Sequence, residues 1–134
     1  MLATLRDDGR PRLVPICFAV DATADRLCLY SALDEKRKAI ADPRRLARVR
    51  DILERPPVSV LVDRWSEDWS QLAWLRLDGM AALLEPAGPG GAASEHRRAV
   101  ALLRARYAQY GAMDLERGPL IRIDVERVSG WSAT

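Results

Sequence analysis

The sequence predicts an α+β domain in which about six antiparallel strands form a barrel-like sheet with two or three helices. Three observations support this fold class. Short apolar segments separated by tight turns fill the first thirty residues, two later segments carry apolar residues at helical spacing, and a final segment alternates apolar and polar residues. The 134 residues, 49% hydrophobic and 30% charged, suit a single folded domain rather than a disordered chain.

The N-terminal part is predicted to be a meander of three strands. Residues 2–5 (LATL) form the first strand, and Gly9 supplies the positive φ of a tight turn. Residues 12–21 (RLVPICFAVD) form the second strand, in which Pro15 indicates an edge or a bulge because proline has no backbone donor. Residues 26–31 (RLCLYS) then return antiparallel to it.

The middle of the chain is predicted to hold a helix followed by two strands. The helix begins at an Asp42 cap with Pro43 in its first turn, and the pair Pro56-Pro57 ends it. Residues 58–63 are then a buried strand. Residues 72–85 form a long strand that bends or bulges at Gly79.

The C-terminal part is predicted to be a helix followed by a closing strand. The helix covers residues 94–111, with Ser94 as its cap and Gly111 at its end. Residues 119–131 alternate cleanly between apolar and polar side chains, whereas the other strands are apolar on both faces. Two-sided burial is expected where a second subunit covers the outer face, so we expect a homodimer; coverage by the protein's own helices is the alternative.

The side chains show no pattern typical of catalysis without a cofactor. His96 is the sole histidine and is predicted to lie on the surface of its helix, so no catalytic triad or histidine metal site can be built around it. Cys17 and Cys28 are predicted to be small buried residues of a reduced, cytoplasmic protein with no metal site. No apolar segment approaches the roughly 20 residues of a membrane helix. If the protein is an enzyme, a cofactor should carry the reaction.

The only two lysines among 21 basic residues are Lys36 and Lys38. In an extended segment they point the same way, roughly 6–7 Å apart, which suits gripping one phosphate or carboxylate. The first turns of the following helix add three arginines, Arg44, Arg45 and Arg48. Because the whole chain has a net charge of only +2, this cluster predicts a local anion site; a solvated charged turn is the alternative.

Tryptophans form a second cluster. Trp69 and Trp74 could wall a flat aromatic ligand, since indole faces stack on heterocycles, or lie in the core or an interface. An RNA-binding barrel would need aromatic residues among the basic ones, and residues 35–62 contain none. We therefore expect no nucleic-acid partner.

Four segments together resemble the pyridoxamine 5'-phosphate oxidase-like (PPOX class) split β-barrel family: LATLRDDGRPRLVPICFAVD, LYSALDEKRK, the stretch from RRLARVRDI to LRLDG, and IRIDVERVSGW. The sequence is most similar to the coenzyme F420-dependent oxidoreductase branch, and SEDWSQLAW and SGWSA are the most specific segments. The resemblance implies one domain over residues 1–134, a six-stranded antiparallel FMN-binding split barrel, and a homodimer with cofactor sites at the subunit interface. Two departures are expected to matter: the N-terminal helix of relatives is absent, and Arg37 stands where relatives carry proline.

The resemblance also implies three groups of cofactor-binding residues. The phosphate contacts would be Ser31, Lys36 and Lys38. The residues lining the ring, largely through backbone groups, would be Val14, Pro15, Ile16 and Cys17. The pocket would be capped, from the same or the partner subunit, by Trp69 and Trp74.

The function implied by the resemblance is hydride transfer between a reduced deazaflavin, coenzyme F420, and an electron-poor small molecule. Coenzyme F420 carries an acidic glutamate tail besides its phosphate, and the arginines of the following helix could bind that tail. Two alternatives remain: an FMN-dependent oxidase or flavin reductase of the same fold, and a non-catalytic module that binds a flavin or haem.

Overall fold

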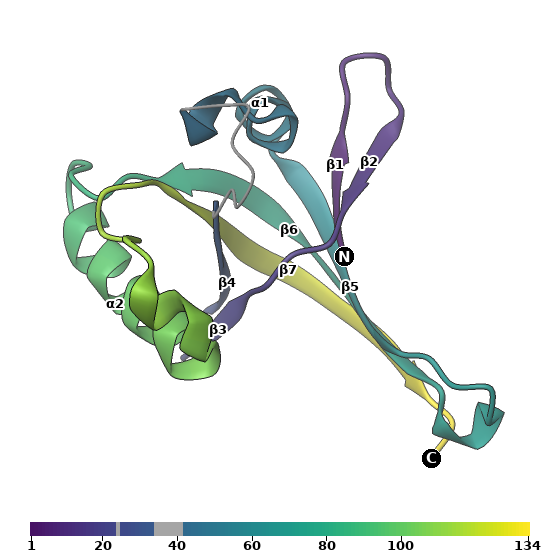
Figure 1. Ribbon diagram of the computed structural model, residues 1–134. Coiled ribbons are helices and arrows are strands. Elements are labelled where there is room, and N and C mark those ends of the chain that lie inside the picture. Colours follow the sequence, from purple (N-terminus) through teal and green to yellow (C-terminus); the bar gives the residue numbers. More distant parts are fainter. Residues whose placement is uncertain (24, 34–41) are drawn as a thin grey trace.

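The computed structural model describes residues 1–23, 25–33 and 42–134 (Figure 1). Its seven strands form one antiparallel sheet in the order β2-β1-β5-β6-β7-β4-β3. The strands are β1 (Leu2–Leu5), β2 (Pro11–Val14), β3 (Ala19–Ala22), β4 (Leu27–Ala32), β5 (Pro57–Arg64), β6 (Ala73–Leu84) and β7 (Leu120–Ser132). The described helices are α1 (Ala47–Glu54) and α2 (Ala92–Arg106), with short 3₁₀-helices η1 (Pro43–Arg45), η2 (Trp69–Gln71) and η3 (Ala108–Ala112). The α+β class is therefore confirmed, although the sheet has seven strands and not the expected six.

The extra strand arises because the segment predicted as one strand, residues 12–21, is two strands at opposite edges of the sheet. β2 pairs with β1, whereas β3 pairs with β4. Pro15, which cannot donate a backbone hydrogen bond, follows directly after β2. Residues 15–18, which we call the crossing segment, run to the other edge of the sheet. The prediction of an N-terminal meander was wrong for this reason.

This crossing shows that the sheet is curved. Val14 and Ala19 are the facing ends of β2 and β3, and a fully extended chain between them spans at most roughly 17 Å. The edges of a flat sheet of this many strands would lie about 29 Å apart. The sheet therefore bends round so that its two edges approach each other, as an open barrel does.

The core lies on both faces of this curved sheet. Leu29 packs with Ile52 of α1 on one face, and its neighbour Tyr30 packs with Leu103 of α2 on the other. On β7, Leu120 likewise packs in the cluster with Leu103 of α2, and Ile121 packs in the cluster with Ile52 of α1. In the body of the molecule, the protein's own helices thus account for the strands that are apolar on both faces.

The central strand, β6, and its neighbour β7 pair along nearly their whole length, with a register shift between Asp78 and Gly79. A Cβ atom at Gly79 would collide with the backbone oxygen of Asp124, so only glycine fits at this crossing of the strands. The bulge predicted at Gly79 is confirmed.

The ends of β5, β6 and β7 extend together beyond the helices as an arm, seen at the lower right of Figure 1. No described helix covers the strands there. The large apolar side chains exposed on the arm are Leu61, Trp65, Trp69, Trp74, Leu75, Val128 and Trp131. We call this set the arm surface.

The helix boundaries differ from those expected. Asp42 caps η1, since its carboxylate accepts the Arg44 N–H, and α1 begins only after Leu46. α2 starts at Ala92 with Gly91 before it, so the Ser94 cap was wrong. No described helix is long and apolar enough to cross a membrane.

Two single-residue expectations were also wrong. His96 is 2% exposed, and its Nε2 lies 2.7 Å from the Gly118 carbonyl oxygen, so it joins α2 to the turn before β7. Cys17 is exposed, because the crossing segment runs outside the strands, whereas Cys28 is buried as expected.

Candidate functional site

A cavity of about 220 Å³ lies where the crossing segment passes the end of β4 and the first turn of α1. Its lining residues are Pro15, Ile16, Cys17, Ser31, Ala32 and Arg48. The structure thus brings together four of the predicted cofactor-binding residues, Pro15, Ile16, Cys17 and Ser31. Val14 is the last residue of β2, directly before this lining.

Ser31 connects the two sides of the cavity. It is 3% exposed, and its Oγ donates a hydrogen bond of 2.8 Å to the carbonyl oxygen of Cys17. With its proton used in this way, the hydroxyl offers a ligand only its lone pairs. In this geometry Ser31 holds the crossing segment against β4.

The three arginines of the predicted anion site have different surroundings. Arg44 donates to both carboxylate oxygens of Glu85, at 2.9 and 2.5 Å, and these bonds raise the pKa of its guanidinium. Arg45 is exposed and lines none of the cavities described here. Arg48 alone borders the cavity, held there by α1, whose neighbouring Val49 is fully buried. Arg44 therefore belongs to an ion pair with Glu85, and Arg48 is the arginine of this group that lines the cavity.

The two lysines on which the anion-clamp prediction depends, Lys36 and Lys38, lie outside the described residues. The last described strand before them is β4, whose final residue, Ala32, lines the cavity.

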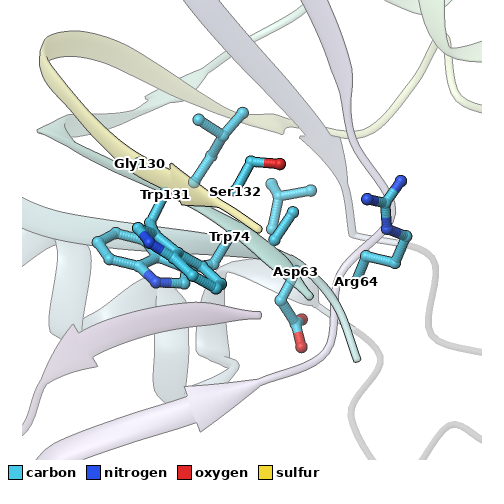
Figure 2. Close-up of a pocket in the computed structure, with 9 residues that line it drawn as sticks. Asp63, Arg64, Trp74, Gly130, Trp131 and Ser132 are labelled. Carbon is cyan, nitrogen blue, oxygen red and sulfur yellow. The ribbon is translucent and has the colours of Figure 1, made fainter. Parts of the chain in front are cut away.

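Trp69 and Trp74 lie on the arm, away from this cavity. Trp69 is 75% exposed in η2 at the arm's tip. Trp74 pairs across the strands with Trp131, and Figure 2 shows the two indoles side by side. Trp74 and Trp131 line two open apolar hollows of about 590 and 540 Å³. Asp63 and Arg64 line both hollows, and Arg76 also lines the second. Within one chain, the tryptophans and the cavity are therefore separate features.

Cys28 belongs to a hydrogen-bonded network on the other side of β4. Its thiol donates to Asp124 at 3.0 Å, and Arg26 donates to the same carboxylate at 2.8 and 2.6 Å. Burial, together with the bond to Asp124, raises the pKa of Cys28 to about 11. The thiol is neutral near pH 7, so this network joins β4 to β7 and supplies no nucleophile.

Sequence reasoning missed two residues that bond to the crossing segment. They are Arg106, the last residue of α2, and Tyr107, which follows it. The Tyr107 hydroxyl lies 3.1 Å from both the N and the O of Phe18, and Arg106 Nη1 donates to the same oxygen at 2.7 Å. No local signal marks this contact, because Tyr107 is 89 residues from Phe18 along the chain.

Comparison with known proteins gives one family. The family model described as Pyridoxamine 5'-phosphate oxidase matches residues 1–132. No curated protein matches the chain by sequence.

Solved structures share the fold at low identity. A conserved hypothetical protein from Mycobacterium tuberculosis has a TM-score of 0.67 and 19% identity, over 98% of this chain and 75% of its own. General Stress Protein 26 from Bacillus anthracis has a TM-score of 0.62 and 20% identity, over 96% and 80%. A FAD-binding protein from Mesorhizobium loti has a TM-score of 0.62 and 24% identity, over 96% and 81%.

Proposed function

Because the chain belongs to the pyridoxamine 5'-phosphate oxidase family, we propose that it is an oxidoreductase that binds a flavin-type cofactor at the cavity beside Ser31. The observation that carries this proposal is the placement of the crossing segment, Ser31 and Arg48 around one cavity. Its described lining holds no pair of groups suited to acid–base chemistry, so a bound cofactor has to carry the reaction. The FAD-binding relative from Mesorhizobium loti is in keeping with this proposal.

The lining suits a flat ring with an anionic tail. Pro15, Ile16 and Ala32 offer apolar surface to a ring. Among the hydrogen bonds of the described residues, none uses the backbone N–H of Ile16 or Cys17, so these donors can meet polar atoms at the ring edge. Arg48 offers a planar guanidinium that binds a phosphate or carboxylate through two parallel bonds.

We propose that the cofactor is coenzyme F420, with FMN as the alternative. Charge supports this choice. Arg48 at the cavity and the exposed Arg45, three residues before it at the end of η1, could bind a carboxylate tail in addition to a phosphate. When bound, the reduced deazaflavin would supply a hydride to an electron-poor small molecule. The protein's part is to orient the ring on the crossing segment and to exclude water from the reacting face.

We further propose that two chains share each cofactor site. The cavity of one chain, about 220 Å³, is smaller than the roughly 300–1,000 Å³ of typical ligand sites, so it can hold only part of a cofactor. The uncovered arm surface is rich in tryptophan, as the centres of protein interfaces are. A second copy that covers this surface could bring its own Trp69 or Trp74 to the cavity. Light scattering should give the molar mass of a dimer, and a monomer at micromolar concentration would contradict this part of the proposal.

The experiment that tests the function is a fluorescence titration of the protein with coenzyme F420 and, separately, with FMN. Tight binding of F420 with weak binding of FMN supports the deazaflavin reductase, and a substrate screen by coenzyme oxidation follows. Preference for FMN favours the oxidase or flavin reductase. Binding of neither would contradict the proposed function. The double variant Lys36→Ala/Lys38→Ala should lose binding without unfolding, and unchanged affinity would show that the lysines do not clamp the phosphate.

A further inference from the structure

The crossing segment lines the cavity but belongs to no strand. Among the described residues, no backbone–backbone hydrogen bond reaches residues 15–18. A strand inside a sheet is fixed by its ladder, and this segment has none. Its position therefore depends on side chains that bond to its backbone.

These side-chain bonds meet at a single peptide group. The carbonyl oxygen of Cys17 accepts from Ser31 Oγ at 2.8 Å, and the N–H of Phe18 donates to the Tyr107 hydroxyl at 3.1 Å. Both atoms belong to the rigid plane of the Cys17–Phe18 peptide. One bond would leave that plane free to turn about the bonded atom, whereas two bonds at its opposite ends fix its orientation.

Tyr107 makes a second bond that fixes the next carbonyl as well. Its hydroxyl donates to the oxygen of Phe18 at 3.1 Å, so one side chain satisfies both backbone groups of that residue. Arg106 Nη1 bonds to the same oxygen, and its guanidinium lies 4.7 Å from the centre of the Phe18 ring.

The anchor of this contact is α2. Tyr107 follows its last residue, and the Tyr107 N–H donates to the Leu103 carbonyl at 2.9 Å. Leu103 and Ala99 are completely buried under the sheet. Because the buried side chains of α2 hold the helix in place, the hydrogen bonds of the Tyr107 hydroxyl attach the crossing segment to a rigid element.

We propose that Tyr107 is a positioning residue of the cofactor site: it fixes the Cys17–Phe18 peptide from the side opposite Ser31, and so sets the backbone of Ile16 and Cys17 against the ring edge. This inference rests on the proposed function. It separates two tasks within one site, because in the proposed function Arg48 meets the anionic group whereas Tyr107 acts on the ring alone.

The test compares Tyr107→Phe with a matched control, Arg104→Met, in the full chain. Tyr107→Phe keeps the ring and removes the hydroxyl. Arg104 lies in the last turn of α2, close to Tyr107 in the chain. Its hydrogen bonds go to Tyr110, Met113 and Glu116 and not to the crossing segment. The control therefore loosens the end of α2 without touching residues 15–18.

Two readouts are needed. Hydrogen exchange of the protein without cofactor should show the Phe18 amide exchanging at least tenfold faster in Tyr107→Phe, and unchanged in Arg104→Met. Titration with F420, FMN and riboflavin, which has the ring but no phosphate, should show affinity falling about tenfold in Tyr107→Phe, a loss of ~1.4 kcal/mol. Riboflavin and FMN should lose affinity by the same factor, and the absorbance of the bound ring should shift.

The outcomes separate this inference from the proposed function. Wild-type binding with unchanged affinity and spectrum in Tyr107→Phe would overturn the positioning role and leave the function standing. Loss of FMN affinity with riboflavin unaffected would place the effect at the phosphate and also overturn it. A wild type that binds none of the three ligands would overturn both.

Discussion

The hydrogen bonds of Asp51 lead to a prediction about stability that can be worked through from the structure. Asp51 lies on α1, the helix that carries Arg48, and the residue is 5% exposed. Its Oδ2 accepts from Thr4 Oγ1 and from Arg12 Nε, both at 2.7 Å. These two bonds attach α1 to the β1–β2 hairpin. Asp51→Ala should therefore loosen the helix that borders the cavity.

The expected loss in the free energy of unfolding is about 3 kcal/mol. The charge-assisted bond from Arg12 is worth about 1.5 kcal/mol, the low end of its range, because Arg12 is one-third exposed and can be rehydrated. The hydroxyl of Thr4, which is 1% exposed, would lose its partner at a further cost of about 1–2 kcal/mol. For a chain of this length the melting temperature should fall by roughly 9 °C.

The assay is urea unfolding of Asp51→Ala, Thr4→Val and the double variant, with Glu54→Ala as control. Glu54 is an exposed carboxylate on the same helix, so its removal should change stability by less than about 0.5 kcal/mol. The double-variant cycle should give a coupling of about 1 kcal/mol between Thr4 and Asp51. Strictly additive losses, or an Asp51→Ala variant as stable as the control, would refute the reasoning.

The pH dependence of this contact has a definite sign. Burial raises the pKa of Asp51, but the hydrogen bonds from Arg12 and Thr4 outweigh it and hold the pKa below its ordinary value. A carboxyl whose pKa is lowered by folding stabilises the protein above its unfolded pKa of about 3.9. The stability difference between wild type and Asp51→Ala should be complete at pH 7. It should shrink as the pH falls through the folded pKa.

Three further predictions concern other parts of the molecule. Arg48→Met should weaken cofactor binding at least tenfold in the fluorescence titration, whereas Arg50→Met, on the exposed side of α1, should not; equal effects would show that the cavity is not the site. Gly79→Ala should lower the free energy of unfolding by about 2–3 kcal/mol in urea, since its Cβ would collide with backbone across the bulge, and wild-type stability would contradict the close approach. A maleimide at pH 8 should label exposed Cys17 within minutes and leave Cys28 unlabelled, because burial keeps Cys28 as the neutral thiol; fast labelling of both in folded protein would refute the network around Asp124.

Local signals in the sequence predicted most of the elements. Gly9 has the positive φ expected of its turn, and Gly79 lies at the expected bulge, because both depend on the backbone of a few neighbouring residues. The division of residues 12–21 into two strands could not be predicted in the same way. Pro15 indicated an interruption, but the partners of each half, β1 and β4, are decided by pairings with β5 and β7 far along the chain.

The candidate site was predicted in part, for a related reason. Ser31 and residues 15–17 were named through family resemblance, and the structure places them at one cavity. The clamp role of Lys36 and Lys38 stays a prediction. Tyr107 could not be found, since nothing near it in sequence shows that its hydroxyl meets Phe18. His96 was misplaced because the carbonyl that binds it, that of Gly118, belongs to a distant turn.

The strand order of the sheet also bears on how the chain folds. β1 pairs with its neighbour β2 and β3 with β4, but the second partners of β1 and β4 are β5 and β7, which are made much later. Pairings between such distant residues are slow to form. A ribosome-bound chain that stops before residue 120 would contain β4 without its partner β7. The apolar side chains of Leu29 and Tyr30 would then lack the β7 residues with which they pack. During synthesis, β4 therefore keeps an unpaired edge and exposed apolar side chains until β7 emerges, the kind of surface through which unfinished chains aggregate.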